Sequence, residues 1–173
     1  MQFETQRLII RKPVIEDAED IFRNYAQDPD VTKYLIWRPH ARVEVTRDWV
    51  QYCIDSFDPE KQLPFVIWHK AEQQTIGMVD FSIHDFRVHF GYVLAKAYWN
   101  KGIMTEAAKP VVEMLLARKG IYRIEAVHDV DNPASGRVMQ KLGMEYEGIL
   151  KRYSLHPNIS QIPRDCRIYA VVK

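Results

Sequence analysis

The sequence contains only two cysteines, Cys53 and Cys166, and it has no CxxC pair. Two thiols so far apart exclude a disulfide framework and are typical of free cysteines in a reducing compartment. The chain also lacks an apolar run of about 18 residues, the length that a membrane-spanning helix needs. Its first residues, Met1 to Glu4, have neither the basic nor the apolar region of a secretory signal. We therefore expect a cytoplasmic protein.

An excess of charge of one sign is absent as well. The 24 Lys and Arg residues nearly balance the 23 Asp and Glu residues, which leaves a formal net charge of +1. Proteins that bind nucleic acids usually need a strongly basic face for their phosphate contacts, and binding to an anionic membrane needs a polybasic segment. The balanced charge argues against both kinds of partner.

The sequence does have enough apolar material for a core. Of its 173 residues, 47% are hydrophobic, which suits one soluble globular domain. No internal repeat, low-complexity tract or Gly/Ser linker interrupts it, so we expect a single domain over residues 1–173. The histidines show no metal-ligand spacing, and we expect no metal.

The spacing of apolar residues predicts a mixed domain of the α/β or α+β class. Apolar and β-branched runs predict strands over residues 7–12, 65–68, 76–83, 88–94, 123–128, 145–153 and 166–172. Helical spacing predicts helices over residues 16–27, 31–35, 45–57, 104–119 and 134–142. In the third of these helices Val45, Trp49, Cys53 and Phe57 recur every fourth residue, so we expect Trp49 in the core.

The most informative stretch lies between a predicted strand and a predicted helix, and reads Tyr98-Trp-Asn-Lys-Gly-Ile-Met-Thr-Glu-Ala107. The start of a helix has backbone N–H groups without partners and a positive dipole end, which suit a phosphate group. Gly102 would allow close approach and Lys101 adds a positive charge. A plain turn, with Gly102 at the bend and Thr105 as a helix cap, explains the stretch equally well. It is neither a GxGxxG nor a GK[ST] motif, which argues against dinucleotide and nucleoside triphosphate chemistry.

Several ordered motifs resemble one family, the GNAT (Gcn5-related) N-acetyltransferases, and within it the RimJ/RimL-type ribosomal-protein branch. The matching motifs are Glu4-Thr-Gln-Arg-Leu8 with Arg11, Gly91-Tyr-Val-Leu94 followed by the stretch from Tyr98 to Ala107, Arg123-Ile-Glu-Ala126, Asn132-Pro-Ala-Ser135, Lys141-Leu-Gly-Met144 and Glu147-Gly148. The resemblance runs from Glu4 to about Gly148, and weakly to the segment from Asp165 to Tyr169.

The resemblance implies a GNAT fold, in which a mixed, mostly antiparallel sheet is flanked by helices and two parallel central strands splay apart. The splayed strands would be residues 88–94 and 123–128, with acetyl-CoA between them as cosubstrate. The residues that would bind it are Tyr92, Val93 and Leu94 along the pantetheine, the loop residues Asn100, Lys101, Gly102, Ile103, Met104 and Thr105 at the pyrophosphate, and Asn132 and Ser135. The reaction implied is direct transfer of the acetyl group to a primary amine, without a covalent enzyme intermediate.

The departing thiolate benefits from a hydroxyl acid. Many members of the family have a tyrosine one turn after the Ser135 position, where this chain has Met139. We expect Ser135 to donate the proton, as in the ribosomal-protein branch; alternatively it only bonds the helix start or the pantetheine. Trp99 and Met104 also depart from the family pattern, but donation by backbone amides does not depend on those side chains.

The attacking amine must lose a proton, because a free α-amino group has a pKa of about 7.7–8.0. The resemblance identifies no base. The candidates are Asp80, His89 and Glu125, with His128 and Asp165 as further ones, and a water relay without a single base is an equal alternative. Glu125 has a structural alternative too, an ion pair with an arginine such as Arg123 or Arg7.

The resemblance places the segment from Tyr34 to His40 over the acceptor side, so Trp37, Arg38 and His40 are candidates for substrate binding; alternatively Trp37 belongs to the core. The acceptor is a protein N-terminal α-amine or a small amine such as an amino acid, a polyamine or an antibiotic. A CoA-binding sensor that has lost catalysis is the alternative of a different class. Dimers are common among such proteins, so a homodimer is compatible with the resemblance.

Overall fold

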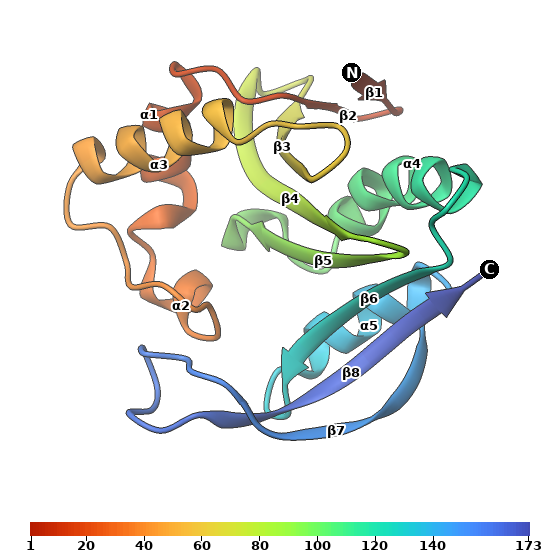
Figure 1. Ribbon diagram of the computed structural model, residues 1–173. Coiled ribbons are helices and arrows are strands. Elements are labelled where there is room, and N and C mark those ends of the chain that lie inside the picture. The colour runs from red at the N-terminus through yellow and green to blue at the C-terminus, as the bar shows by residue number, and fades with distance from the viewer.

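The computed structural model describes all residues 1–173 and contains an eight-stranded sheet with helices packed against it (Figure 1). The order across the sheet is β1-β2-β3-β4-β5-β6-β8-β7, and only β5 and β6 are parallel. The strands are β1 (Gln2–Glu4), β2 (Leu8–Arg11), β3 (Gln62–His69), β4 (Gln74–His84), β5 (Arg87–Leu94), β6 (Arg123–Asp129), β7 (Glu145–Ser154) and β8 (Arg164–Val172). The predicted fold class is confirmed.

Along the chain, the helices lie between consecutive strands. They are α1 (Asp17–Ile21), which continues into the π-helical turn η1 (Phe22–Ala26), then α2 (Pro29–Thr32), α3 (Val43–Asp55), the short 3₁₀ turn η2 (Lys96–Tyr98), α4 (Ile103–Ala117) and α5 (Pro133–Lys141). None of them combines the length and the apolar character that crossing a membrane would require.

The parallel pair β5–β6 separates soon after it begins. Arg87, Val88 and His89 pair with Arg123, Ile124 and Glu125, and no pairing continues beyond them. The ends of the two strands, from Phe90 to Leu94 and from Ala126 to Asp129, therefore diverge (Figure 1). Backbone groups along the inner edges of these ends have no partner strand, which is what an extended ligand requires.

The two faces of the sheet carry different side chains at the centre. Phe81 of β4 and Phe90 of β5 are paired neighbours whose rings stack at 4.8 Å on one face. Asp80 is paired with Gly91, so both lie on the opposite face. Helices α1 and η1 pack against β4, and α3 packs against α1 and η1. Cys53 of α3 is buried, and burial, with a smaller effect of the Asp80 carboxylate, raises the pKa of its thiol to about 12.

The structure corrects three sequence predictions. The short helix starts at Pro29, because the Asp28 side chain accepts bonds from the amides of Asp30 and Val31 and fixes its first turn. Strand β1, only three residues long, was missed. In α3 the buried residues are Thr46, Val50 and Cys53.

The buried face of α3 therefore differs from the predicted one at two positions, where Thr46 and Val50 replace Val45 and Trp49, while Cys53 is buried as predicted. Val45 and Trp49 are 38% and 41% exposed, so the prediction that Trp49 lies in the core is wrong. The apolar residues of α3 cover two adjacent faces of the helix, one packed on the core and the other at the surface, and period alone does not distinguish them.

Helix α5 approaches β6 closely at Gly136. A Cβ atom there would lie 2.8 Å from Nε2 of His128 and 3.2 Å from the hydroxyl of Tyr169. The His128 ring is buried, and its Nδ1 donates to the Asp129 carbonyl at 2.7 Å, so the ring has little freedom to move aside. Only glycine lets α5 come this close to the strand.

We expect Gly136→Ala to lower the free energy of unfolding by about 1–3 kcal/mol, the usual cost of overpacking a core. Gly91→Ala is the matched control, because its Cβ would meet nothing within 4 Å, and its stability should be unchanged or slightly raised. Denaturant unfolding of both variants measures the difference. Equal stability of the two would show that α5 can shift without cost.

Candidate active site

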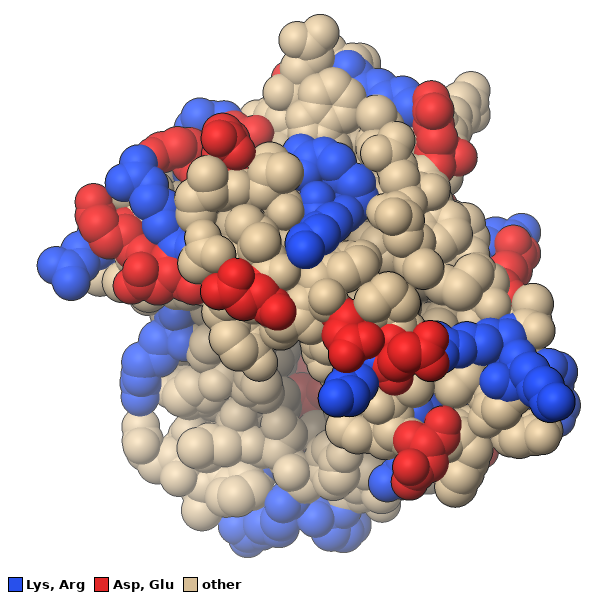
Figure 2. All heavy atoms as spheres, turned by 45° about the horizontal axis from the view of Figure 1, so that its top comes forward, with Lys and Arg blue, Asp and Glu red and all other residues tan.

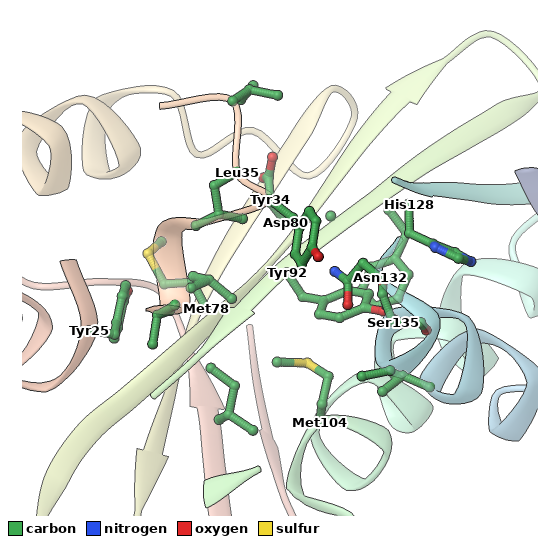
Figure 3. Close-up of a pocket in the computed structure, with 18 of the residues that line it drawn as sticks. Tyr25, Tyr34, Leu35, Met78, Asp80, Tyr92, Met104, His128, Asn132 and Ser135 are labelled. Atoms are coloured by element: carbon green, nitrogen blue, oxygen red, sulfur yellow. Dashed lines mark hydrogen bonds between the residues drawn. The ribbon is translucent and has the colours of Figure 1, made fainter. Parts of the chain in front are cut away.

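A cavity of about 900 Å³ runs through the gap between the diverging ends of β5 and β6. One end is lined by the loop before α4, the middle by β5 and the start of α5, and the other end by α3 and the segment from Lys33 to His40. Figure 3 shows Asp80 and Tyr34 near its centre, with Leu35 and Met78 on one side and Tyr92, Asn132 and Ser135 on the other.

The loop before α4 has the geometry of an anion site. Asn100 and Gly102 both have left-handed backbones, with φ of 60° and 72°, and Gly102 is the N-cap of α4. No side chain caps this helix, so Thr105 is not a cap. A Cβ on Gly102 would meet only Arg7 Nη2, at 3.9 Å, so the space in front of the helix is open. These uncapped amides in open space fit the pyrophosphate of acetyl-CoA.

Two motifs that are distant in the sequence hold this loop together. Glu106, in the first turn of α4, accepts bonds from the Thr5 hydroxyl at 2.6 Å, the Arg7 amide at 3.0 Å and Arg7 Nε at 2.7 Å. Arg7 Nη1 also donates to the Lys101 carbonyl at 3.1 Å. Burial would raise the pKa of Glu106, but these donors outweigh it and the pKa is lowered. The Glu-Thr-Gln-Arg-Leu motif thus positions the predicted pyrophosphate loop.

Trp99, a departure from the family pattern, has a structural role at the end of β5. Its indole N–H donates to the Leu94 carbonyl at 2.8 Å. The indole therefore already occupies one acceptor position at the end of β5, beside the predicted path of the pantetheine.

Ser135 lies beside Tyr92 in the middle of the cavity. The Tyr92 hydroxyl is 2.5 Å from Ser135 Oγ and 2.9 Å from the Ser135 carbonyl. Burial raises the pKa of Tyr92 well above its usual range, with a smaller opposing effect from Ser135, so the phenol keeps its proton. Asn132, at the start of α5, uses no side-chain atom to cap the helix, which leaves its amide free in the cavity.

Asp80 and His89 are the two base candidates that the structure places on the cavity wall on one face of the sheet. Burial raises the pKa of Asp80, although Gln62 opposes this by donating to both carboxylate oxygens, at 2.6 and 2.7 Å. Burial lowers the pKa of His89, and the charge of Glu125, which favours the protonated ring, opposes this less strongly. His89 is accordingly a neutral imidazole at pH 7, and both groups can accept a proton.

The other candidates are differently placed. Glu125 is paired with Arg123 at 2.7 Å and Asp165 with Lys151 at 2.8 Å, and neither lines the cavity. His128 lines it, but its ring turns away from Asp80 and Tyr92 (Figure 3) and its Nε2 faces Gly136. The structure therefore brings together Asp80, His89, Tyr92, Asn132 and Ser135.

The acceptor end of the cavity includes two of the three predicted residues. Trp37 and His40 line it with ring centroids 5.0 Å apart, whereas Arg38 is exposed outside it. His40 Nδ1 lies 2.8 Å from the Thr46 hydroxyl, and burial lowers its pKa. The side-chain amide of Asn158 donates to the Thr32 and Trp37 carbonyls at 2.7 and 2.8 Å, so the β7–β8 loop is joined to this segment.

Sequence reasoning missed several residues of the cavity, among them Trp49, Tyr52, Gln62, Arg137 and Lys141. Arg137 and Lys141 are one turn apart on α5, form no ion pair and sit at the cavity, so an unpaired i, i+4 pair of cations next to the Ser135 motif was the signal available. No sequence pattern indicated Gln62, because its hydrogen bonds to Asp80 depend on the register of β3 with β4.

Comparison with known proteins identifies the family. Residues 7–145 match the acetyltransferase (GNAT) domain. The chain belongs to the GNAT acetyltransferase family. It is 32% identical to the uncharacterized N-acetyltransferase p20 of Bacillus licheniformis, over 86% of this chain and 85% of that protein. It is 30% identical to the [ribosomal protein uS5]-alanine N-acetyltransferase of Escherichia coli, over 90% of this chain and 84% of that protein. A GNAT acetyltransferase structure from Bacillus anthracis superposes with a TM-score of 0.84 at 29% identity, over 99% and 98% of the chains.

Membership confirms the resemblance to the GNAT family and its RimJ/RimL-type branch. The GNAT domain described here is an N-acetyltransferase that uses acetyl-CoA as cosubstrate.

Gly102→Glu should weaken acetyl-CoA binding by tenfold or more, because a carboxylate would occupy the space in front of the α4 amides and repel the pyrophosphate. Gly143→Glu is the matched control: its φ of 81° imposes the same backbone strain, and the residue lies outside the cavity. Isothermal titration with acetyl-CoA compares the two. Unchanged affinity in Gly102→Glu would place the pyrophosphate elsewhere.

Proposed function

We propose that this enzyme transfers the acetyl group of acetyl-CoA directly to the N-terminal α-amine of a protein, inside the cavity between β5 and β6. One observation carries the proposal. A single cavity connects the uncapped start of α4, the Tyr92–Ser135 pair and the bases Asp80 and His89. The relative that acetylates an alanine of ribosomal protein uS5 supports the choice of a protein N-terminus.

Each group has a defined task in this proposal. The uncapped amides of α4 bind the pyrophosphate, and the cations Arg137 and Lys141 are available for the other phosphate of acetyl-CoA. Asp80 or His89, directly or through water, takes the proton that the amine loses as its nitrogen bonds the carbonyl carbon. A backbone N–H of β5 stabilises the oxyanion. The carbon–sulfur bond then breaks as Ser135 donates its proton to the leaving sulfur. Water returns a proton to Ser135, and the base releases the proton it took from the amine to solvent, so that both groups regain their starting states.

The pair of hydroxyls explains how Ser135 can act as the acid. The Ser135 carbonyl can only accept a hydrogen bond, so the Tyr92 hydroxyl donates either to that carbonyl or to Ser135 Oγ. When Ser135 gives up its proton, the Tyr92 hydroxyl can turn its own proton to Oγ and stabilise the developing negative charge. Met139 is buried in the core, so no other hydroxyl is supplied from that position.

We expect Ser135→Ala to lower kcat about 10²-fold, within the range for loss of a general acid, and to change acetyl-CoA affinity only a few fold. Tyr92→Phe should lower kcat less. Ser135→Thr retains a hydroxyl and should recover most of the activity, and Ser82→Ala, on β4 outside the cavity, serves as control. If affinity and kcat fall together in Ser135→Ala, Ser135 is a cosubstrate ligand and not the acid.

The function itself is tested by thiol release from acetyl-CoA in the presence of peptides that begin with Ala or Ser and carry an internal lysine. The same peptides with a blocked N-terminus are the controls. Turnover with free peptides alone is the expected result. Turnover with blocked peptides would identify the lysine side chain as the acceptor. No turnover with any amine, while acetyl-CoA still binds, would favour a CoA-binding sensor.

A further inference from the structure

The charges that line the cavity are few and mostly neutralised. Its carboxylates are Asp30, Asp80 and Asp129. Asp30 forms an ion pair with Lys96, and Asp129 is bonded by Arg164 through Nε and Nη2. Asp80 has no cationic partner, since the side chain that bonds it is the neutral amide of Gln62. The cavity therefore offers one carboxylate to a cationic ligand.

Cations outnumber this single anion. Lys33, Arg137 and Lys141 line the cavity and form no ion pair. Arg137 and Lys141 are the cations proposed for a phosphate of acetyl-CoA, which leaves Lys33, over the ring of Tyr34, at the acceptor end. A ligand with several positive charges would satisfy one of them at Asp80, would find no second unpaired carboxylate, and would be repelled by Lys33.

The rest of the acceptor end is apolar and aromatic. Tyr34, Leu35 and Trp37 line it from one segment, and Trp49 and Tyr52 from α3, where their rings stack at 5.6 Å. Figure 2 shows a hollow with uncharged side chains on its left, acidic and basic side chains along its upper and right rim, and acidic atoms visible in its depth. Apolar and aromatic walls suit an apolar or planar group next to the amine.

We propose that the acceptor carries a single positive charge next to an apolar or aromatic body, and that Asp80 selects this charge while Lys33 excludes polycations. The inference rests on the proposed function of the site and specifies its substrate class. This substrate class includes an N-terminal α-amine followed by apolar side chains, and it excludes polyamines and aminoglycosides.

The test compares 2-phenylethylamine, an Ala-Phe peptide, spermidine and kanamycin as acceptors. We expect kcat/KM for the first two to exceed that for the polycations at least tenfold. Lys33→Glu should reduce this ratio several-fold, because it reverses one repulsive charge. Lys61→Glu, which makes the same change at an exposed site outside the cavity, should leave the ratio unchanged.

Binding separates failure of this inference from failure of the proposed function. Titration of each amine into enzyme saturated with CoA should show tighter binding of the monoamine than of spermidine, whether or not transfer occurs. Equal or better binding and turnover of spermidine or kanamycin would overturn the substrate class and leave the acetyltransferase function intact. If Lys33→Glu and Lys61→Glu had the same effect on the ratio, Lys33 would have no role in selection.

Discussion

The divergence of two parallel strands after three paired residues is the constraint on which the rest of this molecule depends. If β5 and β6 stayed paired to their ends, the edge of β5 would be filled and the cavity would not exist. Because they separate, each half of the sheet needs its own support. Helix α5 gives this support on the β6 side through its close approach at Gly136, and β4 gives it on the other side through continuous pairing with β5.

The gap also decides where chemistry can occur. Neighbouring residues on β5 face opposite ways, so Tyr92 reaches Ser135 on one face while His89 and Gly91 open toward α3 on the other. Gly91 has no side chain, and a Cβ there would meet no atom within 4 Å, so the space beside Asp80 stays open. An acyl donor and an acceptor can therefore approach the same point from different faces of one sheet, and each meets groups suited to its own charge.

Much of this arrangement was accessible from the sequence, because it depends on local signals. The bend at Gly102 before α4, the helix after Asn132 and most strands follow from residue type and spacing, whereas the roles predicted for Asn132 and Ser135 came from the resemblance to the family. The inward placement of Asp80 and His89 was recognised only as one of several alternatives. It requires the register of β4 with β5, which is set by long-range pairing.

The orientation of α3 was out of reach for a related reason. Its sequence offers two apolar faces, and the face that packs inward is decided by α1 and η1, which the helix meets only in the folded chain. The bonds of Asn158 to Thr32 and Trp37 likewise join residues more than a hundred positions apart. Such contacts produce no periodic pattern in the sequence.

The bonds from Thr5 and Arg7 to Glu106 have a consequence for synthesis of the chain. The donors leave the ribosome about a hundred residues before their acceptor does, and contacts of such long sequence separation form late in folding. Until α4 emerges, the Arg7 guanidinium lacks its carboxylate partner and the loop at Lys101 lacks its support. Affinity for acetyl-CoA is thus a property that the nascent chain gains late, when strands made early and a helix made much later meet.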